Sequence, residues 1–424
     1  MTEKQQLLSL FADCDDLVTV SAGSAEVCYI KSVCDTVYIA RQIVCPLSSG
    51  VINLPVAAIK ELTEVQDMSD AMVRGSAIIF RGKRIFCVPA VREASRSVGA
   101  AESDITVKGP KAAFTEDVDT NLSLLRRYIR TDRLKTVAFD IGEETKTRVL
   151  LCYVEGRVSK KVLEMLIDKL RTISPTVMID SGSLAPLLTG KSGYPFFSLL
   201  GSSEKVDKVA SKMIAGRAAL ICDGSPFVLT APYVFAETLQ SAEDYLRSKW
   251  YATFIRLLRF VSLLVSFLLP ACYLCFKSGG DTFVDLLTTL LIFEILREVG
   301  VRMPRTVGDA VGIVGSLIIG DAAVKAGLIT DESIIVMALS AVCAFIVPAY
   351  MYSVTLLRII FVAIAALLGT NGVILGVSLL LGLMCGTESF GCPYMSPVAP
   401  IDTKGLLDFI LTVPSKVLGR KEKL

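Results

Sequence analysis

The sequence predicts tandem α/β soluble subdomains followed by an α-helical polytopic membrane domain, and three observations lead to this prediction. Of the 424 residues, 52% are hydrophobic and only 20% are charged. Charge is spread evenly before Trp250 and becomes sparse within the long apolar runs that follow. Two hairpin-like segments of the first half resemble each other. This length suggests two or three structural units, and this composition excludes a disordered chain and disfavours an ordinary soluble enzyme.

The residue inventory excludes several functions. The chain has no histidine, which rules out Ser-His-Asp and Cys-His catalysis, histidine-ligated zinc and imidazole pH switches. A net charge of +2 gives no general attraction to nucleic acid. The 12 cysteines, most of them beside apolar residues, are interpreted as core residues in a reducing compartment. We therefore expect a protein that is not an enzyme and that carries no cofactor or metal.

The first α/β subdomain is expected over residues 1–100. The start of the chain lacks the apolar segment of a signal peptide, so this half is expected to stay on the cytoplasmic side. Apolar runs predict strands, and apolar residues at helical spacing predict helices. The expected elements are a strand over Ala25–Val33, helices over Leu54–Leu62 and Asp67–Met72, and strands over Gly75–Arg81 and Arg84–Pro89 around a turn at Gly82.

A linker over residues 101–120 leads into a second α/β subdomain over residues 121–249. The segment Met72–Ala77 before the first hairpin resembles Met213–Ala218 before the second, which predicts an internal repeat. The expected elements of this subdomain are a strand over Val149–Val154, a helix over Ser159–Ile173, a strand over Thr176–Ile179, a helix over Glu204–Ala215 and a hairpin across Asp223-Gly224.

One segment of the second subdomain has the spacing of an enzyme motif. Ala185–Ser192 approximates a phosphate-binding P-loop, with alanine in place of the first glycine. A working P-loop opens directly into a helix, whereas Gly193, Tyr194 and Pro195 follow here and break a helix. We therefore interpret this segment as a surface loop.

The membrane domain is expected over residues 250–385, with a C-terminal cytoplasmic tail over residues 386–424. Trp250 and Tyr251 resemble interfacial aromatics, and basic residues around them predict entry from the cytoplasm. The basic tail favours a cytoplasmic C-terminus, so one of five apolar segments is expected not to cross. These segments are Phe254–Phe276, Thr282–Arg297, Val307–Gly327, Ser333–Tyr352 and Val354–Cys385.

Two of these segments have unusual lengths. Thr282–Arg297 is short for a bilayer at 1.5 Å per residue. Val354–Cys385 is longer than one span needs, and Gly369–Gly372 interrupts it. It is either one tilted helix or a re-entrant pair, which hydropathy does not distinguish.

Acidic residues in or beside these segments are the candidate ion-pathway residues, because intramembrane acids normally face a wet path or a partner. They are Glu294, Glu298, Asp309 and Asp321. The alternative is that Glu294–Arg297 and Asp321–Lys325 are structural pairs. Small residues at every fourth position form an expected helix-packing face, consisting of Gly308, Gly312, Ser316 and Gly320.

Several motifs in this order resemble one protein family, the A subunit of GerA-type spore germinant receptors. The most specific is Glu294–Pro304, which reads EILREVGVRMP. The others are Val107–Pro110, Phe114–Glu116, Asn121, Leu124–Arg127, Tyr194–Phe196, Asp223–Leu229, Thr253–Arg259, Ile313–Gly315 and Ile319–Gly327. The short loop between Phe276 and Thr282 departs from the family pattern, as do the aspartates at 309 and 321, where glutamine is commoner. Because of these departures, a sporulation-stage paralogue of the A subunit remains an alternative to a receptor subunit.

The resemblance implies a membrane subunit in the inner membrane of the bacterial spore that helps to sense nutrients and trigger germination. It also implies a B-type transporter-like subunit and a C-type lipoprotein as partners, and a homo-oligomer that forms or gates an ion channel. The rival hypothesis is a secondary transporter of a small solute or ion. Transporters usually show internal membrane repeats, whereas the repeat predicted here lies in the soluble half.

Overall fold

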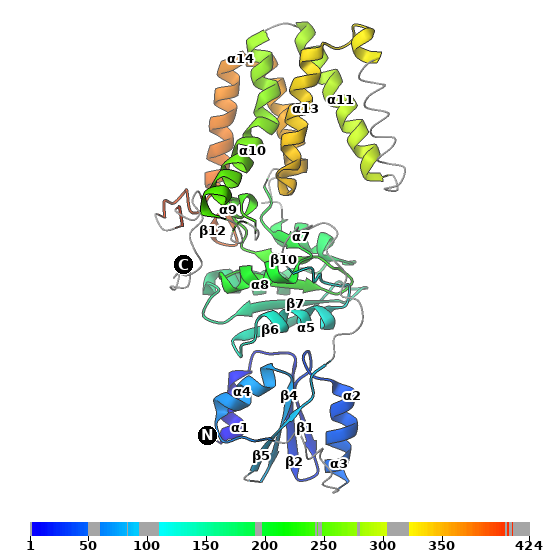
Figure 1. Ribbon diagram of the computed structural model, residues 1–424, viewed down its shortest axis with the longest axis vertical. Coiled ribbons are helices and arrows are strands. Elements are labelled where there is room, and N and C mark those ends of the chain that lie inside the picture. Colours follow the sequence, from blue (N-terminus) through cyan, green and yellow to red (C-terminus); the bar gives the residue numbers. More distant parts are fainter. Residues whose placement is uncertain are drawn as a thin grey trace.

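The protein is elongated, with two sheets and a helical bundle arranged in a row (Figure 1). The computed structural model describes residues 2–49, 60–82, 84–92, 110–190, 197–241, 244, 248–277, 280–302, 322–402, 405–406 and 409. The first sheet carries the N-terminus at one end, the second sheet lies in the middle, and the helices form the other end. This arrangement confirms the predicted fold class of tandem α/β units followed by a helical domain.

The first sheet has five antiparallel strands in the order β1-β2-β4-β5-β3. They are β1 Leu17–Ala22, β2 Ala25–Ile30, β3 Lys60–Glu61, β4 Ser76–Arg81 and β5 Arg84–Pro89. The helical elements packed with this sheet are α1 Glu3–Leu10, α2 Thr36–Tyr38, η1 Ile39–Val44, α3 Cys45–Ser48 and α4 Val65–Val73. One apolar core, with Phe11, Ile30, Met68 and Ile78 among its fully buried members, holds the unit together.

The second sheet repeats this strand order as β6-β7-β9-β10-β8. Its strands are β6 Leu134–Ile141, β7 Thr147–Val154, β8 Gly201–Ser203, β9 Ala218–Cys222 and β10 Val228–Ala231. Its helices are α5 Val118–Tyr128, α6 Lys160–Thr172, α7 Ser181–Thr189, α8 Val206–Ile214 and α9 Phe235–Leu239. Apolar residues of α5 and α8 cover one face, and those of α6 and α7 cover the other.

The internal repeat is visible in the backbone as well as in the strand order. Helices α4 and α8 each end two residues before a glycine, Gly75 or Gly216, with φ of +91° and +95°. Glycine adopts this left-handed conformation without the steric cost that a Cβ imposes, which ends the helix and redirects the chain into the hairpin. The two predicted hairpins are therefore equivalent elements of the two sheets.

Two expected elements of the soluble half are wrong. The expected helix over Leu54–Leu62 includes Lys60 and Glu61, but in the structure these two residues form the exposed edge strand β3 against β5. The rest of that expected helix, residues 54–59, lies outside the described residues. Thr176–Ile179 is irregular and not a strand, because carbonyls at its start accept hydrogen bonds from the turn between β6 and β7. The Glu143 amide donates to the Pro175 carbonyl at 3.0 Å, and the Glu144 amide donates to the Thr176 carbonyl at 3.1 Å.

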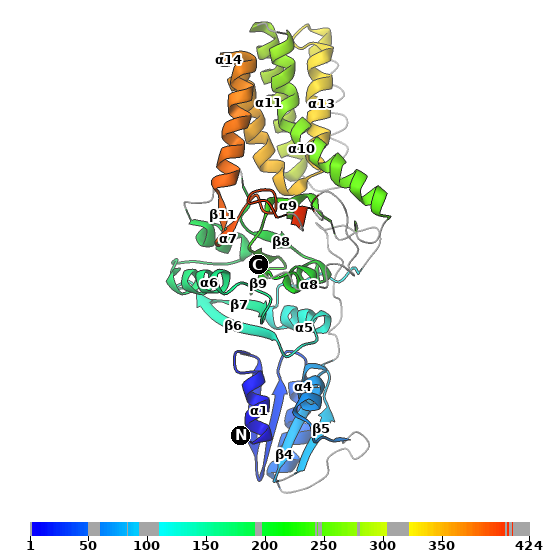
Figure 2. The same cartoon turned by 90° about the vertical axis from the view of Figure 1, so that its left-hand side faces the viewer.

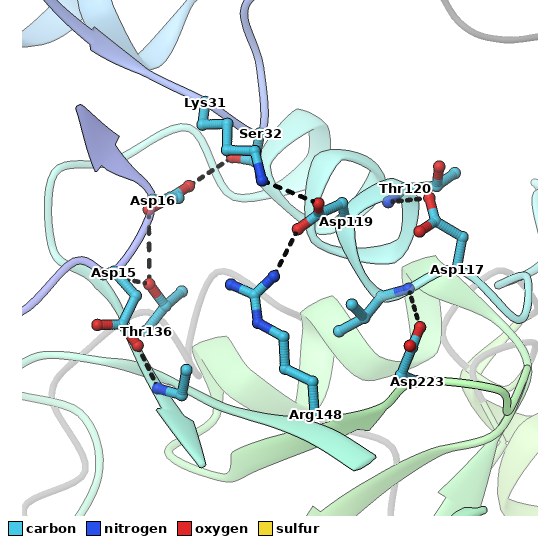
Figure 3. A network of polar contacts seen from close by, with 12 residues as sticks. Asp15, Asp16, Lys31, Ser32, Asp117, Asp119, Thr120, Thr136, Arg148 and Asp223 are labelled. Atoms are coloured by element: carbon cyan, nitrogen blue, oxygen red, sulfur yellow. Dashed lines mark hydrogen bonds and ion pairs between the residues drawn. The ribbon is translucent and has the colours of Figure 1, made fainter. Parts of the chain in front are cut away.

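The two sheets meet through a buried ion pair. Arg126 of α5 is fully buried, and its guanidinium contacts both carboxylate oxygens of Asp16, at 2.7 Å from Nε and 2.6 Å from Nη2. Asp16 is 5% exposed and also accepts from the hydroxyl of Ser32. At the rim of the same contact, Asp119 pairs with Lys31 and Arg148 at 3.1 and 3.2 Å (Figure 3). Polar groups, rather than a shared apolar core, thus join the two units.

Among the residues that the structure describes, the bundle has four long helices and the short η5. They are α10 Lys249–Lys277, α11 Gly280–Arg302, α13 Asp331–Phe345, η5 Pro348–Tyr350 and α14 Met351–Gly386. By length and composition, the segments Lys249–Lys277 and Pro348–Gly386 are apolar enough to cross a membrane, within the part of the chain that the structure describes. Helix α11 has 23 residues but is not among these segments, so the expectation that Thr282–Arg297 is short for a bilayer stays a prediction.

The expected span Ser333–Tyr352 ends earlier than its hydropathy indicates. Helix α13 ends at Phe345, and Pro348 opens the short η5 before α14 begins at Met351. At this same end of the bundle, next to the second sheet, the first turns of α10 project to the side in Figure 2. Trp250, the single tryptophan of the chain, lies there and is 86% exposed.

Helix α14 reverses direction at Gly369, where φ is +58° and ψ is −149°. In a straight helix Phe361 and Gly376 would lie about 22 Å apart. Instead, a Cβ on Gly376 would be 3.1 Å from the Phe361 ring, so the two halves of α14 pack against each other. The segment is therefore a pair of antiparallel helices and not one tilted helix. Tyr350 before α14 and Tyr394 after it share a hydroxyl hydrogen bond, so both ends of the hairpin lie at the same end of the bundle.

The chain after α14 packs onto the second sheet. The strands β11 Glu388–Ser389 and β12 Cys392–Pro393 form a small hairpin. Ser389 is fully buried; its hydroxyl accepts from the Tyr233 amide at 3.0 Å and donates to the Leu199 carbonyl at 2.8 Å. The first ten residues of the expected tail thereby fix the C-terminal end of the bundle to the second sheet.

Candidate functional site

A buried polar cluster lies inside the helical bundle, centred on Arg358 of α14. This side chain is 1% exposed. Its Nε donates to the carbonyl of Ser266 in α10 at 3.0 Å, and its Nη2 donates to the carbonyl of Ser340 in α13 at 3.4 Å. The hydroxyl of Ser340 donates to the same Ser266 carbonyl at 2.6 Å. Arg358 therefore ties three helices together.

The sequence explains why the Ser266 carbonyl is free to accept these bonds. In an α-helix a carbonyl accepts from the amide four residues later. Four residues after Ser266 stands Pro270, inside α10, and proline has no amide hydrogen. The carbonyl is left without its helical donor, and Arg358 and Ser340 take its place.

Helix α11 joins the cluster through Glu294. Glu294 Oε2 lies 2.5 Å from Arg297 Nη2, one helical turn later. Its Oε1 accepts from the hydroxyl of Thr355 at 3.2 Å and lies 3.8 Å from Arg358 Nη1. Arg297 also donates to Thr355 at 2.6 Å. Two arginines face one carboxylate, so this cluster carries one positive charge in excess.

The structure places the predicted site residues differently. Glu294 enters the cluster as the partner of Arg297, which is the structural pair left open as an alternative. Glu298 is exposed and pairs with Arg302 at 2.6 Å. The remaining candidates lie outside the described residues: Asp309, Asp321, Gly308, Gly312, Ser316 and Gly320. Their roles stay predictions.

Sequence reasoning missed Arg358. The available signal was a single charged residue within the 36-residue apolar helix α14, since an arginine in such a segment normally marks a buried partner or a wet path. Its partners could not be found from sequence, because they come from three other helices.

The segment with P-loop-like spacing is helical, not a surface loop, from Ala185 to Thr189, where it belongs to α7. The Asp180 carboxylate caps the start of this helix by accepting from the Ser183 amide at 2.8 Å, and so competes with any phosphate there. A mainly apolar cavity of about 850 Å³ lies beside α7, and Tyr352 of α14 is among its lining residues. Within the described ranges, no His, Cys, Asp or Glu side chains are grouped as three or more potential metal ligands.

A second buried ion cluster lies where the second sheet meets the bundle. Glu237 of α9 pairs with Arg217 Nε and Lys212 Nζ, each at 2.8 Å. Burial opposes ionisation of this carboxyl, but Lys212 and Arg217 hold its pKa below the ordinary value of 4.5. The same helix, α9, contacts the C-terminal segment through the Phe235 amide and the Tyr394 carbonyl, at 2.9 Å.

We expect Glu237 to contribute to stability with a defined pH dependence. Because its pKa is lower in the folded protein, its contribution is complete above the ordinary value and is lost as the pH falls through the lowered one. At pH 7, Glu237→Gln should cost about 2 kcal/mol, since two partly buried cations lose their partner. Thermal unfolding of the full chain at pH 7 and pH 3 measures both effects. Equal losses at both pH values would contradict the assignment, and the exposed Glu143→Gln is the control.

Two repeated α/β units joined to an apolar helical bundle with a buried charge are typical of a membrane-associated protein. The chain belongs to the Bacillus/Clostridium GerA spore germination protein family, whose family model matches residues 5–278 and 281–424. This membership confirms the family to which the sequence motifs were assigned.

Curated relatives support the same assignment along most of the chain. Spore germination protein KA of Bacillus subtilis (strain 168) is 34% identical over 388 residues, covering 85% of this chain and 71% of that protein. Spore germination protein GerQA of Bacillus cereus is 29% identical and covers 98% of this chain and 91% of its own. The uncharacterized membrane protein YfkQ of Bacillus subtilis (strain 168) is also 29% identical, covering 87% and 77%. These relatives support a germinant-receptor role and membrane association.

One solved structure is also similar, at a lower level. It is the crystal structure of the N-terminal domain of the A subunit of the Bacillus megaterium spore germinant receptor GerK3. The sequence identity is 22%, the TM-score is 0.42, and the match covers 55% of this chain and 94% of that one.

Proposed function

We propose that this chain is the A-type membrane subunit of a spore germinant receptor, which helps to sense nutrients and triggers germination by forming or gating an ion-conducting oligomer. Family membership supports the receptor role. The ion-conducting part rests on one observation, the charged cluster inside an apolar bundle that joins the buried Arg358 to the partly buried Glu294 and Arg297. Charges are costly in such surroundings and are typical of ion pathways and of their gates.

The proposed setting follows from the same assignment. The receptor lies in the inner membrane of the spore, with residues 1–249 on the cytoplasmic side, and acts with a B-type transporter-like subunit and a C-type lipoprotein. Its soluble subdomains comprise residues 1–100 and 121–249 around the linker 101–120. The membrane domain comprises residues 250–385, and the segment from residue 386 returns to the soluble side. The hydrogen bonds of Ser389 to Tyr233 and Leu199 support that return.

The pathway itself is proposed to use the intramembrane acids, with Asp309 and Asp321 beside the small-residue face and Glu294 and Glu298 on α11. In the arrangement described above, Arg297 neutralises Glu294. A Glu294 variant alone therefore leaves two arginines uncompensated and destabilises the bundle. A drop in flux in that variant would not distinguish a loss of conduction from a loss of folding. Removing the pair together preserves the net charge of the cluster.

The test is monovalent-cation flux into proteoliposomes, with the chain alone and with its proposed partner subunits. We expect Asp309→Asn and the double variant Glu294→Gln/Arg297→Gln to slow flux several-fold while expression and assembly stay normal. Gly312→Leu should instead disrupt assembly by blocking close helix packing. The exposed Glu144→Gln of the soluble half is the control. Unchanged flux in assembled variants would return these acids to a structural role, and no flux in any preparation would contradict ion conduction.

A further inference from the structure

The guanidinium of Arg358 is only partly satisfied by its surroundings. Nε and Nη2 donate to carbonyls, whereas Nη1 is buried and has no hydrogen-bond partner in the described part of the chain. The carboxylate that faces Nη1 is Glu294, whose Oε1 stops at 3.8 Å, beyond hydrogen-bond distance. A buried charged donor without an acceptor is unusual and points to a second arrangement in which it has one.

Glu294 compensates Arg358 only in part in the present arrangement, because its carboxylate is shared with Arg297. Its Oε2 contacts Arg297 at 2.5 Å, and its Oε1 accepts from Thr355. One positive charge of the cluster therefore remains uncompensated beside Arg358. Because Coulomb interactions are strong in a medium of low dielectric constant, a cation that approached this level of the bundle would be repelled.

The two sides of this contact belong to different parts of the bundle. Arg358 is held on the block of α10, α13 and α14 by carbonyls, one of which Pro270 leaves free. Glu294 and Arg297 lie on α11 and reach that block through the hydroxyl of Thr355. A small shift of α11, or a rotation of the Glu294 side chain, brings the carboxylate onto Nη1 without moving Arg358.

We propose that Arg358 determines the charge selectivity of the pathway: it repels cations in the arrangement described here, and closer pairing with Glu294 of α11 lowers that barrier. The uncompensated charge then passes to Arg297, whose side chain is 18% exposed against 1% for Arg358. This inference rests on the proposed ion-conducting function and adds the residue that controls it. Arg358 is a positioning residue that acts through its charge. The Arg358 side chain is held in position by the Ser266 carbonyl that Pro270 leaves free. The distance between Arg358 and Glu294 determines how strongly the arginine repels cations.

The test compares K⁺ over Cl⁻ permeability, from reversal potentials in a KCl gradient, for the full chain in planar bilayers. Arg358→Gln should raise basal K⁺ conductance by about tenfold or more, equivalent to removing a barrier of about 1.4 kcal/mol, and shift selectivity towards K⁺. Arg358→Lys keeps the charge and should keep the wild-type reversal potential. Arg302→Gln, which breaks an exposed pair on α11, is the matched control.

A further variant addresses positioning without touching the arginine. Pro270→Ala supplies an amide that competes for the Ser266 carbonyl, so it should change selectivity in the same direction as Arg358→Gln. The two changes together should add little to Arg358→Gln alone. Thermal unfolding shows whether Arg358→Gln folds. If it does not fold, Pro270→Ala still tests the inference.

The outcomes separate this inference from the function on which it rests. Conducting variants with the wild-type permeability ratio in both Arg358→Gln and Pro270→Ala would overturn the inference and leave ion conduction intact. An Arg358→Lys variant that behaves like Arg358→Gln would show a structural role and would also overturn it. If folded wild type and variants all fail to conduct, ion conduction is wrong and the inference is wrong with it.

Discussion

Replacing Arg126 by methionine is expected to destabilise the soluble half by about 3–5 kcal/mol. The substitution leaves the carboxylate of Asp16, which is 5% exposed, buried without its bidentate partner. A buried charge that loses its partner retains the whole cost of its desolvation. Hydrogen exchange of the full chain measures the effect, because the amides of β2 and α5 on either side of the contact should lose protection.

The same interface supplies a matched control. Arg148 pairs with Asp119 at 3.2 Å but is 36% exposed in its side chain, so Arg148→Met should cost no more than about 1 kcal/mol. The double variant Asp16→Leu/Arg126→Met removes both buried charges and should recover much of the loss. Similar effects of Arg126→Met and Arg148→Met would contradict the importance of the buried pair.

Gly369→Val is expected to cost about 3 kcal/mol, because a side chain strongly disfavours the backbone conformation at this position. With φ of +58° and ψ of −149°, the residue lies in a region that is essentially restricted to glycine, and it allows the two halves of α14 to fold together. In the part of the chain that the structure describes, an added Cβ at Gly369 would meet open space, so the expected loss comes from the backbone and not from a clash.

The control for this prediction is Gly382→Val, in the second half of α14. Gly382 has no atom within 4 Å of an added Cβ, and it lies inside the helix. Valine there should change stability by less than about 1 kcal/mol. Thermal unfolding of the detergent-solubilised full chain distinguishes the two variants, and equal melting temperatures would exclude backbone strain at Gly369.

Local patterns were enough to predict the soluble fold. The repeated hairpins are short-range elements, and the glycines before them end α4 and α8 at equivalent places. The expected strand at Thr176–Ile179 failed because apolar residues alone do not provide a neighbouring strand, and the β6–β7 turn takes its backbone bonds. Hydropathy likewise left α14 ambiguous, since the reversal depends on the conformation of one residue, Gly369.

The candidate site was predictable only where it is local. Glu294 and Arg297 are one helical turn apart, so their pairing was among the alternatives. Arg358 contacts residues 92 and 18 positions away in the sequence, and Asp16 lies 110 positions from Arg126. No periodicity links such pairs. The proline four residues after Ser266 indicates that the Ser266 carbonyl lacks its helical donor. The sequence does not indicate that Arg358 of another helix takes that donor's place.

The position of Trp250 provides a spectroscopic reporter that needs no labelling. It is the single tryptophan of the chain, it is 86% exposed, and it stands at the first turns of α10. Indole emission shifts to shorter wavelength when water around the ring is replaced by lipid, so the emission maximum of this chain reports on one place only. Quenching by brominated lipids would measure the depth of that place, and a change in quenching on adding a nutrient would follow the motion of α10 in real time.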